Sequence, residues 1–155
     1  MARPWILIGA LFLPPLVIPA ARADGLKSCS LPFQTILVEG GFSGLARCDE
    51  GNFESRQVGE VAISGKTYAI IDYRYQTKPV SGGSAHGGQR ILIVEDGRKY
   101  LGQYVIATPP FRAISVRGTS VFVDVPASEG NVIKFDENGP PREAYLTQDP
   151  ARLFK

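Results

Sequence analysis

The hydrophobic positions of the chain fall into short runs, and a turn signal such as glycine separates most of these runs from the next. In residues 120–125, three valines occupy alternate positions, while Phe122 and Asp124 occupy the positions between them. An alternation of this period is typical of a strand with one buried face. The pattern predicts an all-β chain of antiparallel strands. Runs of this kind cover residues 35–39, 45–49, 59–63, 66–75, 90–95, 99–107, 113–117, 120–125, 132–136 and 142–146.

Dipeptides that end in glycine predict the turns between these strands. Ser64-Gly65 separates two runs by a two-residue loop, and Asp96-Gly97 supplies the positive φ angles that a tight hairpin turn needs. Asp96-Gly97, Arg117-Gly118 and Asn138-Gly139 recur at a spacing of 21 residues. This rhythm predicts a single antiparallel meander that forms a sandwich or small barrel of about eight strands. Propeller blades would share the rhythm, but the chain has room for about two and a closed propeller needs at least four.

The last residues carry the one local helix signal of the sequence. Asp149 can cap a helix, and Pro150 fits the first helical position. The stretch 149–155 therefore predicts a short C-terminal helical turn that packs Leu153 and Phe154 against the sheet. No other stretch shows sustained helical periodicity.

The first residues have the pattern of a secretory signal peptide. Arg3 provides a positive start, residues 5–18 form an apolar run, and residues 21–23 read Ala-Arg-Ala, an A-x-A cleavage signal. A transmembrane anchor would need about 20 mostly apolar residues, and this run is shorter and is broken by prolines. The sequence therefore predicts a cleaved signal peptide over 1–23 and a single all-β domain over 24–155. It predicts a periplasmic or extracellular location without stable membrane insertion.

Charge argues against nucleic acid as a partner. The full chain has 17 basic and 15 acidic residues, but Arg3 and Arg22 belong to the predicted signal peptide. The mature chain is then formally neutral, so it has no bulk positive field that would hold a polyanion.

The two cysteines, Cys29 and Cys48, predict a disulfide, because the export signal directs the chain to an oxidising compartment. In the loop-entropy model, closing a ring of roughly 20 residues stabilises a fold by about 3 kcal/mol. A metal or redox pair is the alternative. The spacing is far from C-x-x-C, and two cysteines with the distant His86 are an incomplete ligand set. We therefore expect neither a metal site nor a cofactor.

The glycine-rich stretch 80–89 is the first candidate site, because it contains Ser81, Ser84 and the only histidine, His86. The connection from residue 76 to residue 89 is longer than a usual hairpin loop, and long loops are commonly functional or disordered. Three readings stay open: a recognition loop from which His86 protrudes, a catalytic site that joins His86 to a carboxylate, and a flexible crossover. Catalysis requires rigid placement, which neighbouring glycines oppose.

Tyrosines in the middle strands are the second candidate. Tyr73 and Tyr75 project from one face of their run, and the same alternation places Tyr100 and Tyr104 together on one face. Such a stripe usually lies in the core with its hydroxyls at the rim. An open face would instead form a platform for a glycan or a protein, together with the neighbouring Arg74 and Arg90.

These observations favour a non-enzymatic binding or inhibitor-type envelope protein whose partner is a protein or glycan of the cell envelope. A small hydrolase that uses His86 with a carboxylate is one alternative, and a purely structural envelope protein is another. In general make-up the chain is similar to small periplasmic inhibitors of cell-wall hydrolases. That similarity is one of class and does not by itself assign a function.

Overall fold

The computed structural model describes residues 31–42, 52–77, 86–106, 112–124, 131–146 and 149–155. The described chain is mostly β with antiparallel sheets, as the hydrophobic pattern predicts, and it also has one short helix, which the pattern does not predict. The predicted signal peptide, Cys29, Cys48 and the run 45–49 lie outside the described residues. The elements are α1 (Leu31–Glu39), β1 (Asn52–Ile63), β2 (Lys66–Thr77), β3 (His86–Glu95), β4 (Lys99–Ile106), β5 (Ile114–Arg117), β6 (Ser120–Val123), β7 (Val132–Lys134), β8 (Glu143–Leu146) and β9 (Asp149–Arg152).

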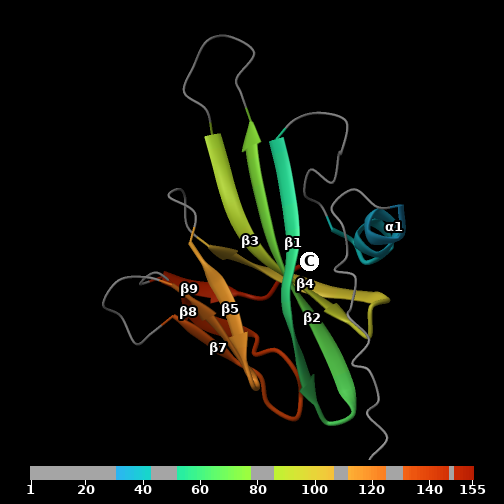
Figure 1. The fold of residues 1–155 in the computed structure, drawn as a ribbon, viewed down its shortest axis with the longest axis vertical. Coiled ribbons are helices and arrows are strands. Elements are labelled where there is room, and N and C mark those ends of the chain that lie inside the picture. Colours follow the sequence, from blue (N-terminus) through green and yellow to red (C-terminus); the bar gives the residue numbers. More distant parts are fainter. Residues whose placement is uncertain (1–30, 43–51, 78–85, 107–111, 125–130, 147–148) are drawn as a thin grey trace, which may run out of the picture.

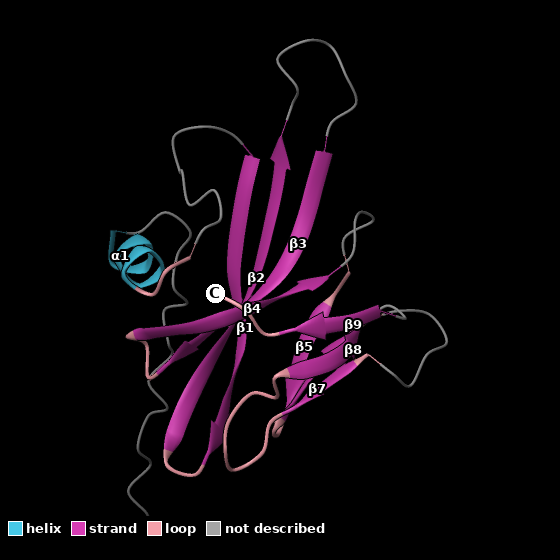
Figure 2. Cartoon of the chain, turned by 180° about the vertical axis from the view of Figure 1, so that it is seen from behind, coloured by secondary structure: helices cyan, strands magenta, loops and turns pink. Residues whose placement is uncertain are grey.

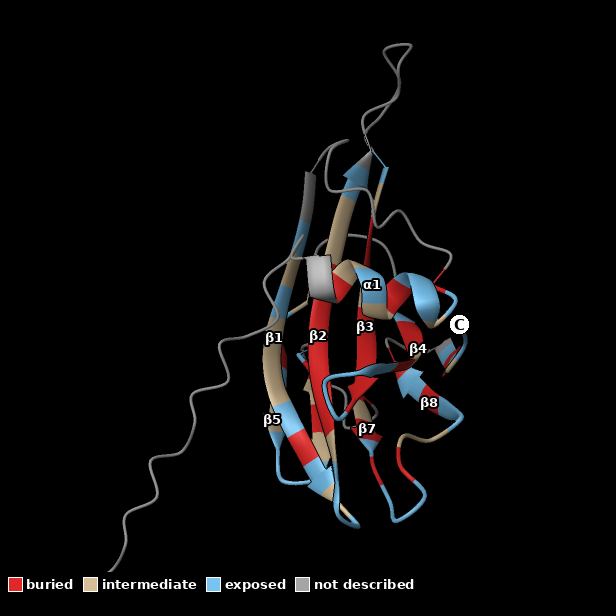
Figure 3. Ribbon diagram, turned by 90° about the vertical axis from the view of Figure 1, so that its right-hand side faces the viewer, coloured by how far each residue is buried: buried red, intermediate tan, exposed pale blue. Residues whose placement is uncertain are grey.

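The described strands form three sheets, in the orders β1-β2-β3-β4, β5-β6-β7 and β8-β9, and none of these closes into a barrel. The four-stranded sheet lies at the centre, with α1 on one side and β5 to β9 on the other (Figures 1 and 2). We call its two sides the helix face and the core face. Figure 3 shows α1 lying over the buried middle of the sheet.

Each face of this sheet has its own apolar cluster, because successive side chains of a strand point to opposite sides. The larger cluster joins the core face to β5 to β9 and includes Ile70, Ile91 and Ile93. The smaller cluster joins the helix face to α1 and includes Ile71 and Leu92. The long central strands are therefore buried on both sides, which explains their nearly continuous apolar runs.

The glycine turns lie where the sequence predicts them. Ser64 and Gly65 have φ values of 52° and 76° between β1 and β2, and Asp96 and Gly97 have 49° and 64° between β3 and β4. Gly118 and Gly139 also have positive φ. Positive φ is the requirement that selects Gly, Asn or Asp in hairpin turns, so local chemistry alone defines these positions.

The predicted strand over 35–39 is wrong, because these residues belong to α1. Phe33 and Leu37 stand four residues apart and both bury their side chains against the helix face. The helix ends at a glycine pair, where the amide of Phe42 donates to the carbonyl of Leu37 at 2.8 Å and Gly41 has a φ of 84°. This is a Schellman-type ending. The i, i+4 spacing and the glycine pair outweigh the β-branched residues between them.

The predicted C-terminal helical turn is also wrong. Residues Asp149–Arg152 form β9, which pairs with β8, and Phe154 then bridges to Gln103 on β4. A helix of one or two turns forms few hydrogen bonds to offset the free-energy cost of its nucleation. The edges of β8 and β4 instead provide unpaired backbone N–H and C=O groups with which this segment can form hydrogen bonds. Leu153 does pack against the core-face cluster, as expected.

Tyr100 and Tyr104 do not share a face. The pairing of β3 with β4 shifts between Ile93, which faces Gly102, and Val94, which faces Tyr100, so Leu101 is an extra residue in β4. This bulge reverses the alternation. Tyr104 therefore packs on the core face, and Tyr100 packs beneath α1.

Buried polar groups tie the core face to the segment before β5. Asp72 is 3% exposed and accepts hydrogen bonds from Arg74 Nη2 and Gln89 Nε2, both at 2.8 Å. Gln89 Nε2 also donates to the carbonyl of Arg112 at 2.8 Å, and the Arg112 amide donates to Gln89 Oε1 at 2.7 Å. Arg74, Asp72 and Gln89 thus satisfy one another and hold residue 112 against the sheet.

Candidate functional site

The structure shows that part of the candidate stretch 80–89 belongs to a strand. The strands continue to Thr77 and resume at His86, which is the register partner of Thr77, so the connection is shorter than the 76–89 loop that we predicted. Ser81 and Ser84 lie outside the described residues. His86 is exposed at the start of β3.

Gly88 lies within the ladder between β2 and β3, and the side chain of Tyr75 lies close above its backbone. The two residues are direct partners, and a Cβ atom at Gly88 would lie 2.6 Å from the Tyr75 hydroxyl. A glycine inside a strand commonly marks such a close approach. The glycines that we interpreted as loop residues therefore include one that makes room for an aromatic ring.

Tyr73 and Tyr75 do lie on one face, as predicted. Their ring centroids are 6.1 Å apart, Tyr73 is buried, and Tyr75 is half-buried. Arg90 packs beside them, with its Cζ 5.3 Å from the Tyr75 ring centroid, a cation–π contact. Arg74, the other arginine of the predicted platform, lies on the opposite face in the network of Asp72.

Arg90 is the centre of a polar group on the helix face that we call the Arg90 cluster: Tyr73, Tyr75, Arg90, Tyr100 and Gln103. Arg90 Nη1 donates to Gln103 Oε1 at 2.9 Å. Burial raises the pKa of Tyr73 to about 12, and the charge of Arg90 opposes this shift. Burial also raises the pKa of Tyr100, again against Arg90. Both hydroxyls are therefore close enough to interact electrostatically with the guanidinium, and both stay protonated at neutral pH.

Three buried polar atoms of the described chain have no hydrogen-bond partner: Ser55 Oγ, Tyr100 OH and Gln103 Nε2. All three belong to the helix face, since Ser55 is the register partner of Tyr73, Gln103 of Leu92 and Tyr100 of Val94. A buried polar group without a partner costs about 1 to 3 kcal/mol. Such groups need an explanation, which can be an ordered water, an ion or a ligand that contacts them.

Gln103 is the member that sequence reasoning missed. It is fully buried in the middle of the apolar run 99–107, and a polar residue at an otherwise apolar position is a usable signal. The bulge at Leu101 hides which face it occupies, so the sequence does not bring it to Arg90.

Replacing Tyr100 by phenylalanine is expected to stabilise the free protein by about 1 kcal/mol, because the change removes a buried hydroxyl that has no partner. Tyr104→Phe is the matched control. Its hydroxyl is also in a buried side chain but donates to the carbonyl of Pro141, so its removal is expected to cost about 1 to 2 kcal/mol. Chemical denaturation measures both, and equal effects in the two variants would contradict the distinction.

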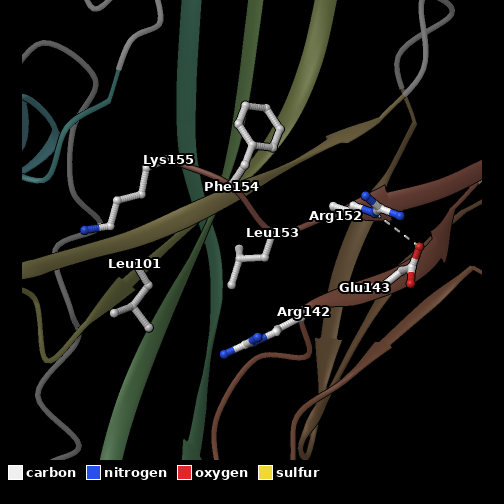
Figure 4. Close-up of a pocket in the computed structure, with 7 residues that line it drawn as sticks. All are labelled: Leu101, Arg142, Glu143, Arg152, Leu153, Phe154 and Lys155. Atoms are coloured by element: carbon white, nitrogen blue, oxygen red, sulfur yellow. Dashed lines mark ion pairs between the residues drawn. The ribbon is translucent and has the colours of Figure 1, made fainter.

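A separate open pocket of about 580 Å³ lies beside β4 and β9 (Figure 4). On its rim Arg152 Nε lies 3.5 Å from Glu143 Oε1. Leu101 and Leu153 project into it from the two sides, so it borders the place where the β9 segment meets β4. None of the residues that we singled out as functional lines it. The lining residues are Leu101, Arg142, Glu143, Arg152, Leu153, Phe154 and Lys155.

In the part of the chain that the structure describes, no group of three or more histidine, cysteine, aspartate or glutamate side chains is placed to hold a metal ion. The described helix α1 has nine residues, and no described helix is long and apolar enough to cross a bilayer. Comparisons with protein-family models, with curated proteins and with solved structures find no match.

Proposed function

We propose that this protein is an exported, non-enzymatic binding protein of the cell envelope, and that it binds its partner at the Arg90 cluster and the adjoining end of the β2–β3 hairpin. One observation carries the proposal. Tyr75 and Arg90 form a half-exposed aromatic–guanidinium contact beside two buried polar atoms that have no partner, Tyr100 OH and Gln103 Nε2. Tyrosine and arginine are the residue types enriched at the energetic centres of protein interfaces.

The remaining parts of the proposal come from the sequence. The stretch 1–23 is proposed as a cleaved signal peptide, with a periplasmic or extracellular destination, and Cys29 with Cys48 as a disulfide. We also propose that the central sheet and the strands β5 to β9 pack as a two-layer sandwich. The core-face cluster, which takes residues from both, supports this arrangement.

The hydrolase alternative has less support. A histidine that acts as a general base needs an orienting partner and a site that excludes water. His86 is exposed to solvent at the first position of β3, so water is not excluded from its side chain. An inhibitor that presents the hairpin end to an envelope enzyme stays within the proposed function.

Affinity capture from the envelope fraction of the source organism tests the proposal. The wild-type protein is expected to retain a partner, and Tyr75→Ala is expected to weaken retention by at least tenfold, as for a central interface aromatic. Protease treatment of the fraction distinguishes a protein partner from a glycan.

Tyr145→Ala is the matched control, because Tyr145 is an exposed tyrosine on β8, on the other side of the molecule from α1. Circular dichroism checks that both variants are folded. Partner retention that is the same in Tyr75→Ala and Tyr145→Ala would refute the proposed binding site.

A further inference from the structure

The Arg90 cluster presents hydrogen-bond donors in excess. A guanidinium carries five N–H donors, and Gln103 Oε1 accepts from one of its nitrogens, Nη1. Gln103 Nε2 and the Tyr100 hydroxyl add further donors that have no acceptor. The group that complements such a set is an acceptor with several lone pairs.

The charge of the cluster is unbalanced as well. Within the described residues no ion pair joins Arg90 to a carboxylate, and the side chains that it contacts there, Tyr75 and Gln103, are uncharged. A cation that is partly removed from water is stabilised by an opposite charge that also forms hydrogen bonds to it. The missing acceptor is therefore an anion.

The core face of the same sheet contains a comparable arginine–glutamine pair that does share an anion. There an arginine and a glutamine on neighbouring strands, Arg74 and Gln89, both donate to the carboxylate of Asp72, with N–O distances of 2.8 Å. On the helix face Arg90 and Gln103 stand on neighbouring strands and are hydrogen-bonded to each other, but among the residues that the structure describes no aspartate joins them. Arg90 and Gln103 thus correspond to Arg74 and Gln89, but they have no described counterpart of the Asp72 carboxylate.

From this parallel we propose that Arg90 and Gln103 form a binding site for a carboxylate, supplied by an aspartate or glutamate side chain of a protein partner. The inference rests on the proposed binding function and names the chemistry of its ligand. A single guanidinium with an amide matches a planar monoanion, and forked pairing with arginine is the usual geometry for a carboxylate.

The position of Tyr75 favours a protein partner over an acidic sugar. Its ring lies against Gly88 and contacts Arg90, which reduces the ring surface on which a sugar could stack. An extended acidic side chain can reach the half-exposed guanidinium of Arg90, which donates to the buried Gln103 behind it.

NMR titration of the ¹⁵N-labelled full chain tests the site directly. Acetate and N-acetyl-aspartate amide are expected to shift the Arg90 Nε–Hε and Gln103 side-chain amide signals in a saturable way, whereas acetamide at the same concentrations is not. Absence of saturable shifts, as when only a water molecule occupies the site, would overturn the proposal. Tighter saturation by glucuronate than by N-acetyl-aspartate amide would overturn the assignment to a protein side chain.

Two variants that remove the same charge provide the control. Arg117 also stacks on an aromatic ring, with its Cζ 5.4 Å from the Phe122 centroid, but it lies at the end of β5. Arg90→Gln is expected to weaken acetate binding at least tenfold, and Arg117→Gln is expected to leave it unchanged. Arg90→Lys keeps the charge but not the fork, so it is expected to give an intermediate loss.

The same variants separate the two proposals. Retention of the captured partner that depends on Tyr75 but not on Arg90 would overturn the carboxylate site and leave the proposed binding function in place. Retention that is independent of Tyr75 would overturn the binding function itself.

Discussion

Replacing Asp72 by alanine is expected to lower the free energy of unfolding by about 3 to 5 kcal/mol, the usual cost of breaking a buried ion pair by removing one partner. Asp72 is almost fully buried, and its carboxylate accepts from both Arg74 and Gln89. Its loss removes the carboxylate that pairs with the mostly buried Arg74. It also loosens the contact of Gln89 with the backbone of Arg112, which holds the segment before β5.

The matched control is Glu143→Ala, which also removes one acid from an arginine pair. Its partner Arg152 is 80% exposed and Glu143 is 46% exposed, at a distance of 3.5 Å. Exposed pairs contribute about 0 to 1 kcal/mol, so this variant is expected to unfold close to wild type. Urea denaturation at neutral pH measures both. A loss for Asp72→Ala no larger than that for Glu143→Ala would show that the buried network does not stabilise the fold.

Replacing Gly102 by alanine is expected to destabilise the attachment of the β9 segment by about 3 kcal/mol, since overpacking costs about 1 to 3 kcal/mol and a strained backbone adds to it. A Cβ atom at this position would lie 2.8 Å from the carbonyl oxygen of Phe154 and 3.0 Å from Leu153 Cδ1. Gly102 also has a φ of 154°. Neither the backbone oxygen nor the packed leucine can move without loosening this segment.

Hydrogen exchange locates that effect. The amide of Gln103 donates to the carbonyl of Phe154 at 2.8 Å, and the amide of Phe154 donates back at 3.2 Å. Both amides are expected to exchange faster in Gly102→Ala. The control is Gly97→Ala, because Gly97 has a φ of 64° but nothing lies within 4 Å of a Cβ atom there. That variant is expected to cost about 1 kcal/mol without faster exchange at Gln103. Equal exchange in the two variants would disprove the clash.

Local chemistry accounts for what the sequence predicts well. The hairpin turns at Ser64-Gly65 and Asp96-Gly97 need positive φ, and the residues that tolerate it are few, so their positions are legible in the sequence. The strand β6 can also be predicted from the sequence, because its residues alternate between a buried face and a less buried face.

Structural features that depend on how one strand pairs with another cannot be predicted from the local sequence. The extra residue Leu101 changes the face of Tyr100, yet nothing in the run 99–107 marks it apart from Gly102. The C-terminal strand β9 exists because β8 and β4 offer edges, a tertiary effect that overrides a local capping signal.

The candidate site shows the same division. Alternation alone places Tyr73 and Tyr75 on one face. The predicted platform that also includes Arg74 is wrong, because Arg74 lies on the opposite face with Asp72. The contact of Arg90 with Gln103 needs the register of β3 and β4, including the bulge. The sequence therefore predicts the aromatic part of the site, whereas the polar part depends on how two strands align.

The bridge between Gln103 and Phe154 has a consequence for the order of folding. β1 to β4 pair with their neighbours in sequence, but the outer edge of β4 is covered by a segment about fifty residues further along the chain. Until that segment has been made and has docked, β4 presents unsatisfied amides and carbonyls that another strand can capture. Early folding of the central sheet therefore creates an aggregation hazard, which persists until residue 154 reaches β4.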